Sequence, residues 1–396
     1  MITLFHHAKV KKINQISKSN QSKNVEILFF IIFFFYFCIK YQKGMRRERN
    51  FEVLRTMAMF FIVVYHCLTH GIGDGYAFPT SMSIPLSNVL FSDFMLVFSS
   101  ISVNLYVLIS GYFLVDLNFK LSRIVRTWVN ACFYSCVITS LFMLFQISEL
   151  NILNLGKSFF PISTDAYWFV TQYIGLLILS PFLSLMVRNL SYRQYLILLI
   201  CGSFLCLSIV QDFPLGKRFH VAHGNSVWSF AYLYLVAGFV KHHLKTISRN
   251  RLILTIVLVT LLTFAFEIFG GYNKDAIYLY WLNYNGLPFV LSVAVFIMVR
   301  QIQVPQNVFW NLCVKIAPYT FGVYLIHDHL LVRKLLWTTM TMSSYCEKLI
   351  FPLIVIGICS IIFIVGTIID VVRKKLFALL GIDNLIVRVD RWSFYS

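Results

Sequence analysis

Apolar segments of about twenty residues recur along this chain between residues 53 and 370, and short basic segments separate them. About 20 apolar residues is the length that an α-helix needs to cross a lipid bilayer. Hydrophobic residues make up 59% of the sequence and charged residues only 13%, which is well below the charged share of a soluble domain. The sequence therefore predicts an all-α, polytopic membrane protein.

The apolar runs and the basic residues between them predict a single membrane domain of about ten transmembrane helices. If the first helix enters from the cytoplasm, most lysines and arginines between the spans lie on the cytoplasmic side, as the positive-inside rule requires. Both ends of the chain are then cytoplasmic, including the tail at residues 376–396. The expected spans are residues 53–70, 93–114, 125–146, 167–187, 194–210, 227–241, 252–269, 281–299, 316–336 and 349–370.

The first 44 residues do not follow this pattern. Their apolar run, residues 27–39, is short for a span, and a spanning orientation would place the lysines before it on the outer side. We therefore expect an N-terminal appendage at residues 1–44, ahead of the membrane domain at residues 45–375. Met45 directly precedes the basic start of that domain, which favours the interpretation that the native chain begins there or that the appendage is dispensable.

The formal net charge of +18 raises the question of a nucleic-acid partner. The basic residues lie between apolar runs, so cytoplasmic loops and anionic lipid account for them, and we expect membrane lipid and no nucleic acid as partner. The nine cysteines show neither Cys-x-x-Cys nor Cys/His zinc spacing. No metal is therefore expected. Nothing in the sequence indicates a protein partner.

Two ionisable residues lie inside the first expected helix. Arg55 and His66 are eleven positions apart, which is close to three helical turns, so their side chains share one stripe about 16 Å apart along the axis. Such groups are costly within a bilayer and usually functional. Arg55 could instead reach the headgroups, and His66 could be a neutral, hydrogen-bonded imidazole. Their position on one face favours a functional site.

Two further pairs stand at the ends of expected helices. Arg123 and Arg126 share a face at the start of the third span, and two guanidinium groups suit phosphate. An ordinary positive-inside anchor is the alternative. Ser110 and Gly111, near the end of the second span, allow either a bound ligand or the close approach of another helix.

Other polar residues fall within the spans. Asn104 and Tyr106 lie in the second span, and Gln172 lies in the fourth. The ninth span carries His327 and Asp328 in its outer half, with further ionisable residues nearby. Groups of this kind need partners or water, so at least one of them is expected to line a polar cavity.

Taken in order, several of these elements resemble the acyltransferase family 3 of integral membrane acyltransferases. The resemblance covers roughly residues 46–375, and the appendage departs from the family pattern. It is carried by the Arg55-x10-His66 spacing, SGYFL at 110–114, Arg123-x-x-Arg126, the segment from Tyr167 to Pro181 and FGVYLIHDHLL at 321–331.

This resemblance implies transfer of an acyl group, usually acetyl, from acyl-CoA to a hydroxyl of a cell-surface polysaccharide or lipid-linked glycan, such as O-antigen or exopolysaccharide. It places the protein in a bacterial inner membrane. It assigns catalysis to His66 with its paired Arg55, and donor binding to Arg123 and Arg126. We add Ser110 and Gly111 to the donor side as candidates.

A mechanism consistent with the residues follows. The arginines hold the phosphates of cytoplasmic CoA, and the deeper His66 takes a proton from the attacking hydroxyl. Ser110, Asn104 and Tyr106 are candidates for stabilising the oxyanion, and a covalent acyl-histidine route stays open. A transporter for glycans or lipid-linked sugars is the alternative function, although the chain shows no clear internal repeat of the kind that transporters often have.

Overall fold

The computed structural model describes residues 48–72, 84–147, 152–164, 166–206, 225–272 and 286–392. Every regular element within these ranges is a helix, which confirms the predicted all-α class. The expected appendage at residues 1–44 lies outside the described residues.

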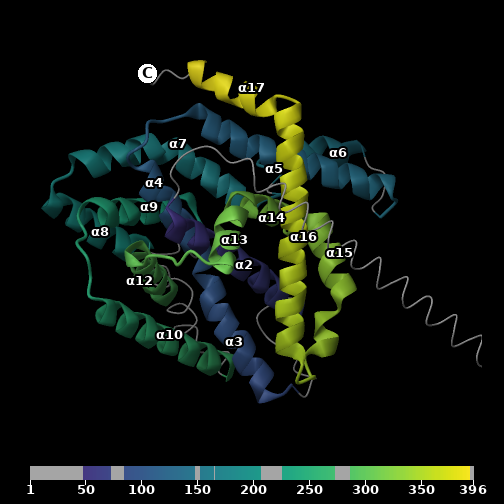
Figure 1. Cartoon of the computed structure of the whole chain (residues 1–396), viewed down its shortest axis with the longest axis horizontal. Helices are drawn as coiled ribbons and strands as arrows, with labels where there is room; N and C mark the ends of the chain where they lie inside the picture. The colour runs from purple at the N-terminus through teal and green to yellow at the C-terminus, as the bar shows by residue number, and fades with distance from the viewer. Residues whose placement is uncertain are drawn as a thin grey trace, which may run out of the picture. The chain divides into compact units, whose positions relative to one another are not determined.

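Fifteen α-helices are labelled along the described chain (Figure 1). They are α2 (Arg49–His70), α3 (Leu86–Ser100), α4 (Ser102–Leu114), α5 (Leu121–Leu144), α6 (Ile152–Ser158), α7 (Trp168–Asn189), α8 (Tyr192–Cys206), α9 (Val227–His242), α10 (Arg249–Tyr272), α12 (Leu287–Gln301), α13 (Val308–Ile316), α14 (Thr320–His327), α15 (Leu330–Met340), α16 (Phe351–Leu379) and α17 (Ile382–Arg388). Short 3₁₀ turns lie at η4 (Ala317–Tyr319), η5 (Met342–Tyr345) and η6 (Val389–Trp392).

Five helical segments among the described residues are long and apolar enough to cross a membrane. Each of the ten expected spans overlaps a helix or a pair of helices, but the others are shorter, broken or only partly described. The count of about ten and the orientation therefore stay predictions. The five segments are Arg49–His70, Leu86–Leu114, Leu121–Leu144, Trp168–Asn189 and Phe351–Leu379.

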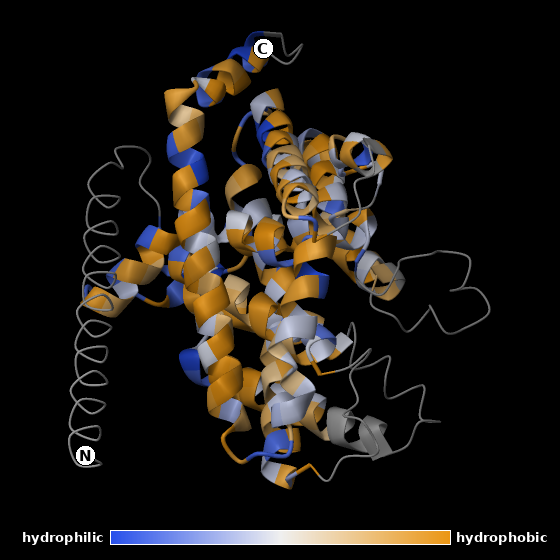
Figure 2. Cartoon of the chain, turned by 90° about the vertical axis from the view of Figure 1, so that its right-hand side faces the viewer, coloured by the Kyte–Doolittle hydropathy of each residue, from blue (hydrophilic) through white to orange (hydrophobic). Residues whose placement is uncertain are grey.

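The outward faces of the long helices are apolar. On α7, Ile178, Phe182 and Leu185 are all about half exposed and recur at helical spacing on one side. On α16, Leu353 and Ile361 are exposed in the same way, and Figure 2 shows hydrophobic colour along the helices on this side. Faces of this kind are stable against lipid and not against water, so the fold indicates a multi-pass membrane protein.

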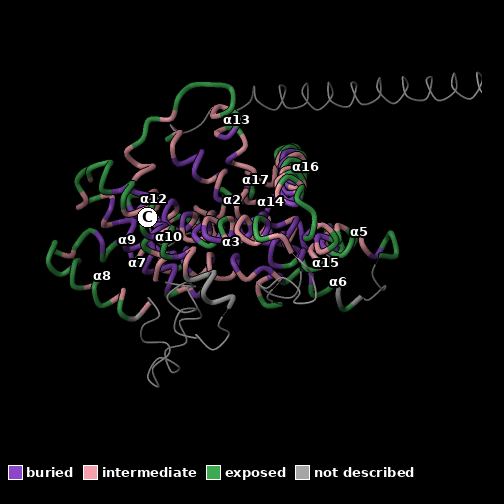
Figure 3. Tube along the Cα trace, turned by 90° about the horizontal axis from the view of Figure 1, so that it is seen from below, coloured by how far each residue is buried: buried purple, intermediate pink, exposed green. Residues whose placement is uncertain are grey.

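Helix α2 is surrounded by other helices. It packs against α3, α4, α12, α13, α14, α15 and α16, and Figure 3 shows buried residues concentrated around it. Its first turn is held by Phe51, whose ring lies 5.0 Å from that of Tyr112 and 5.4 Å from that of Phe296. Most side chains of α2, including that of His66, therefore face other helices.

Basic residues gather where α4, α7, α9 and α12 end, and we call this region the basic end. Lys241 pairs with Asp116 at 2.7 Å, Arg188 donates to the Val115 carbonyl at 2.9 Å, and Arg300 donates to the Leu244 carbonyl at 2.9 Å. Burial raises the pKa of Asp116, but hydrogen bonds from Lys241 and His242 outweigh it and hold that pKa below its usual value. The loop-charge argument placed these basic residues on one side of the membrane, and they do lie together.

The ninth expected span is not one helix, so the expectation of a continuous helix over residues 316–336 is wrong. Helix α14 ends at His327, and α15 begins at Leu330. His329 interrupts the helix because its backbone is extended (φ −59°, ψ 132°), and its Nδ1 accepts from the Leu331 N–H at 3.3 Å. His329 is thus the N-cap of α15, which a histidine fills by the same geometry as other side-chain acceptors.

The long α16 continues past the boundary expected at residue 375. It reaches Leu379 because Phe377 is buried against the ring of Phe133 at 5.2 Å. A turn at Gly381, with φ of +68°, then redirects the chain into α17 and η6. This C-terminal segment, residues 381–392, packs against α5.

Candidate active site

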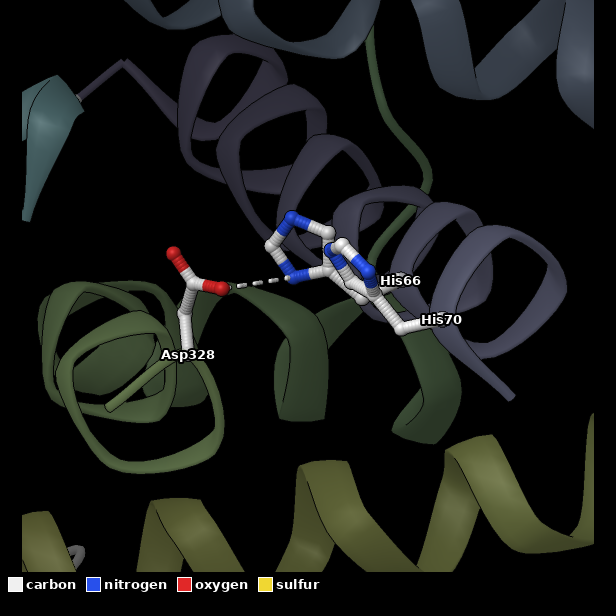
Figure 4. Close-up of side chains that lie close together, drawn as sticks. All are labelled: His66, His70 and Asp328. Atoms are coloured by element: carbon white, nitrogen blue, oxygen red, sulfur yellow. Dashed lines mark ion pairs between the residues drawn. The ribbon is translucent and has the colours of Figure 1, made fainter. Parts of the chain in front are cut away.

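Three ionisable residues meet where α2 faces the break between α14 and α15. His66 comes from α2, while His327 and Asp328 come from the end of α14. All three are nearly inaccessible, with 8%, 2% and 3% of their surface exposed. Figure 4 shows the carboxylate of Asp328 directed at the imidazole of His66. A buried polar group is stable only with a partner, so this cluster is built as a network.

The two histidines form a directional chain of hydrogen bonds. Nδ1 of His327 lies 2.6 Å from the Val323 carbonyl oxygen, which can only accept, so this nitrogen carries the proton of the neutral ring. Nε2 of His327 is then an acceptor, and it lies 2.9 Å from Nδ1 of His66. In the neutral pair His66 therefore donates through Nδ1, and its Nε2 keeps a free lone pair.

Asp328 adds a negative charge beside this chain. Its Oδ1 lies 3.6 Å from Nδ1 of His66 and accepts from Arg333 at 3.2 Å. In a continuous helix, residues 328 and 333 would point to different sides and could not pair. The break between α14 and α15 lets Arg333 reach Asp328. An imidazolium that formed on His66 would be stabilised by this carboxylate.

Helix α14 is fixed in place from two sides. The Tyr167 hydroxyl donates to the Leu325 carbonyl at 2.9 Å, and Gly322 lies directly against the carboxylate of Asp370 in α16. Asp370 accepts from Tyr134 at 2.8 Å and pairs with Arg373 at 2.8 Å. The position of His327 therefore depends on contacts with α7, α5 and α16.

A second polar group joins α4 to α14 and α7. Tyr106 donates to the Thr320 hydroxyl at 2.7 Å, and the Ser110 hydroxyl lies 3.1 Å from that of Tyr173. Arg55 is within electrostatic range of Tyr106. Its guanidinium pairs with Glu52 at 2.8 Å. Because α2 is unbroken, Arg55 and His66 keep their expected separation along one helix.

The expected donor-binding arginines lie beside the C-terminal segment. Arg123 donates to the Asn118 carbonyl at 2.8 Å, and Arg126 pairs with Asp383 of α17 at 3.3 Å. The Ser122 backbone N–H and hydroxyl both donate to Asp390, at 2.8 Å and 2.7 Å. Slight burial raises the pKa of Asp390, but these hydrogen bonds outweigh it and lower the pKa below its usual value.

The remaining sequence candidates have plainer surroundings. A side chain at Gly111 would meet Cα of Tyr234 at 2.9 Å, so close packing of α4 on α9 accounts for this glycine. Asn104 and Gln172 are half-buried in α4 and α7, and no interaction among the described residues joins them to the histidine pair. The structure thus brings His66, His327 and Asp328 together and leaves these candidates apart.

Sequence reasoning missed several residues close to these networks. His70 lies four positions after His66, and helical spacing alone could have placed it on the same face. Glu52, three positions before Arg55, could have been found in the same way. The roles of Tyr134 and Asp370 depend on contacts between distant helices, and no local pattern marks them.

The site and its surroundings define a class of protein: a membrane-embedded helical bundle whose first helix carries an interior acid–base group. The family model of the acyltransferase domain of acyltransferase family 3 matches residues 48–371, so the chain belongs to this family and is an acyltransferase. This membership decides for an enzyme over a transporter. No curated protein and no solved structure matched the chain.

Proposed function

We propose that this protein is a membrane O-acyltransferase that moves an acyl group, usually acetyl, from acyl-CoA to a hydroxyl of a cell-surface polysaccharide or lipid-linked glycan. The acyltransferase family supports the reaction type. The exposed apolar helices support a membrane location, and we place the protein in the bacterial inner membrane. The observation that carries the proposal is the hydrogen-bond chain from the Val323 carbonyl through His327 to Nδ1 of His66, because it leaves the proton acceptor of the His66 ring at Nε2.

His66 is the general base of the proposed reaction. Its Nε2 takes the proton of the acceptor hydroxyl while the hydroxyl oxygen attacks the thioester carbonyl carbon. The tetrahedral intermediate collapses, the carbon–sulfur bond breaks, and the proton on His66 passes to the departing thiolate of CoA. The ester and free CoA are the products, so atoms and charge balance.

His327 and Asp328 support this base. Nε2 of His327 accepts a hydrogen bond from Nδ1–H of His66 at 2.9 Å. This bond holds the His66 ring in the tautomer whose Nε2 is unprotonated. When His66 becomes positive, Asp328 at 3.6 Å opposes that charge. This is the logic of a histidine base oriented by a third group, with an imidazole in the orienting position.

Arg55, Arg123 and Arg126 form the proposed donor side. Guanidinium groups bind phosphates through paired hydrogen bonds, and CoA carries several phosphates. Each of these arginines now contacts an acceptor within the chain: Glu52, the Asn118 carbonyl or Asp383. CoA therefore binds by exchanging these contacts for its own phosphates.

The test compares two histidine variants in cells that lack the native copy. With His66→Gln we expect the O-acyl signals in the NMR spectrum of the surface glycan to disappear, at an unchanged amount of protein in the membrane. His242→Gln, which removes an imidazole at the basic end, should leave those signals in place. Glycan from the His66→Gln cells with normal acylation would reject the proposed role of His66.

A further inference from the structure

A third imidazole stands beside the proposed base. His70 follows His66 by one turn of α2, and the two rings lie 5.5 Å apart. One ligand atom each from His66, His70 and Asp328 fall within 4.8 Å of one another (Figure 4). His66 and Asp328 are buried, whereas His70 is exposed at the end of the helix. The cluster is therefore reachable from outside the bundle.

We propose that His66, His70 and Asp328 form a binding site for a divalent transition-metal ion of the zinc class, and that occupancy of this site inhibits acyl transfer. Two imidazoles and one carboxylate are a ligand set that zinc adopts, with an open fourth position. Hard oxygen-seeking cations such as magnesium are disfavoured by the nitrogen ligands. His66 and His70 lie four positions apart on α2, and Asp328 comes from a distant segment, so no single local motif contains the whole site.

The geometry needs only a small adjustment. Zinc holds nitrogen and oxygen ligands at about 2.1 Å, which puts two ligands of a tetrahedral ion about 3.4 Å apart. Nδ1 of His66 and Oδ1 of Asp328 already lie 3.6 Å apart. All three ligand atoms lie within 4.8 Å of one another, so the ion has to draw them together by at most about 1.4 Å.

Two neighbours oppose the ion. Arg333 occupies Oδ1 of Asp328 at 3.2 Å, and Nε2 of His327 contacts Nδ1 of His66 at 2.9 Å. The metal must displace both contacts, and the positive charge of Arg333 repels it. The site therefore binds a metal reversibly rather than holding a permanent one, and Arg333 sets its affinity.

Inhibition follows from the tautomer of His66. A metal on Nδ1 takes the lone pair of that nitrogen, so the ring proton moves to Nε2. Nε2 then becomes a donor and can no longer accept a proton from a hydroxyl. This step rests on the proposed function, whereas metal binding does not.

The binding test uses the purified full-length protein in detergent, stripped of metal, and titrated with Co²⁺ as a spectroscopic substitute for Zn²⁺. Wild type should develop the visible absorption of a four-coordinate ion. His70→Gln should weaken binding at least ten-fold, because the loss even of an outer partner of a metal ligand costs 10- to 100-fold. His242→Gln, which removes an imidazole paired with Asp116 at 2.9 Å, is the matched control and should bind normally.

Arg333→Gln should change the metal affinity in the opposite direction from His70→Gln. Removing the competing guanidinium should tighten binding of Co²⁺ and Zn²⁺ several-fold. Unchanged binding in His70→Gln would overturn the site, since the metal would then be held without His70. Weaker binding in Arg333→Gln would overturn the competition at Asp328.

An activity measurement completes the test. Zn²⁺ should inhibit acyl transfer by wild type, and His70→Gln should keep its basal activity while needing at least ten times more Zn²⁺ for the same inhibition. Normal metal binding without inhibition would contradict the catalytic role of His66 and leave the binding site standing. The two proposals therefore fail in distinguishable ways.

Discussion

Gly322 of α14 lies so close to Asp370 of α16 that a methyl group on the glycine would overlap the carboxylate. The carboxylate is held by Tyr134 and Arg373, so it cannot move aside. We expect Gly322→Ala to destabilise the protein by about 1–3 kcal/mol, the usual cost of an overpacked core. It should also displace His327 and lower activity.

Gly357 of α16 is the matched control for this change. A Cβ at Gly357 meets nothing within 4 Å, so alanine there should be neutral or slightly stabilising, because glycine weakens a helix interior. Thermal unfolding in detergent measures both variants. Equal unfolding temperatures for Gly322→Ala and Gly357→Ala would contradict the contact with Asp370.

The ion pair of Asp370 with Arg373 is a second target. Its side chains are only 2% and 12% exposed, and breaking a buried pair from one side typically costs 3–5 kcal/mol. We expect Asp370→Asn to lose about that much stability, because Arg373 is left with a buried, unpaired charge. The double variant with Arg373→Met should recover part of the loss. A double variant less stable than Asp370→Asn would show that the remaining hydrogen bond from Arg373 to Asn130, at 3.0 Å, matters more.

His327 orients His66, and its replacement separates orientation from binding. We expect His327→Phe to lower kcat by about 10²–10⁴, the range of general-base catalysis, with little change in KM for acyl-CoA. His327→Gln should retain more activity, because its carbonyl oxygen can still accept the Nδ1 proton of His66. Steady-state kinetics in nanodiscs gives both constants. A rise in KM with an unchanged kcat would place His327 in substrate binding instead.

The pair between Arg126 and Asp383 predicts a change in donor affinity. If Arg126 binds a phosphate of CoA, Asp383 competes with that phosphate. Exposed pairs of this kind are worth about 0.2–1 kcal/mol, so Asp383→Asn should lower KM for acyl-CoA by at most about five-fold. Asn384→Ala, at the next position of α17, is the control. An increase in KM would mean that Asp383 positions Arg126 for the donor.

Some of the architecture could be predicted from the sequence, because a membrane helix is determined by a continuous run of apolar residues. Runs of apolar residues located helices such as α2 and α16, and Arg55 and His66 do lie on one unbroken helix, as expected. The break at His329 was not foreseen, since histidine is not a strong helix breaker. The break is stabilised by the His329 side chain, whose Nδ1 accepts from the backbone N–H of Leu331.

The site was predictable only in part, because its contacts join helices that are distant in the sequence. The pattern singled out His66, His327 and Asp328 separately, but their contact depends on how α2 packs against α14. The roles of Tyr167 and Asp370 arise from helices far apart in the chain. The sequence assigned Ser110 and Gly111 the same alternatives. In the structure, Ser110 hydrogen-bonds the Tyr173 hydroxyl, whereas Gly111 allows α9 to pack closely.

The interruption after His327 divides one apolar segment into two short helices, α14 and α15, joined by a non-helical turn at Asp328 and His329. Helix α14, anchored by Gly322 and Tyr167, keeps the imidazole relay in register. Helix α15 carries Arg333, whose pair with Asp328 at 3.2 Å reaches across the break, so a change in the tilt of α15 would alter the charge beside His66.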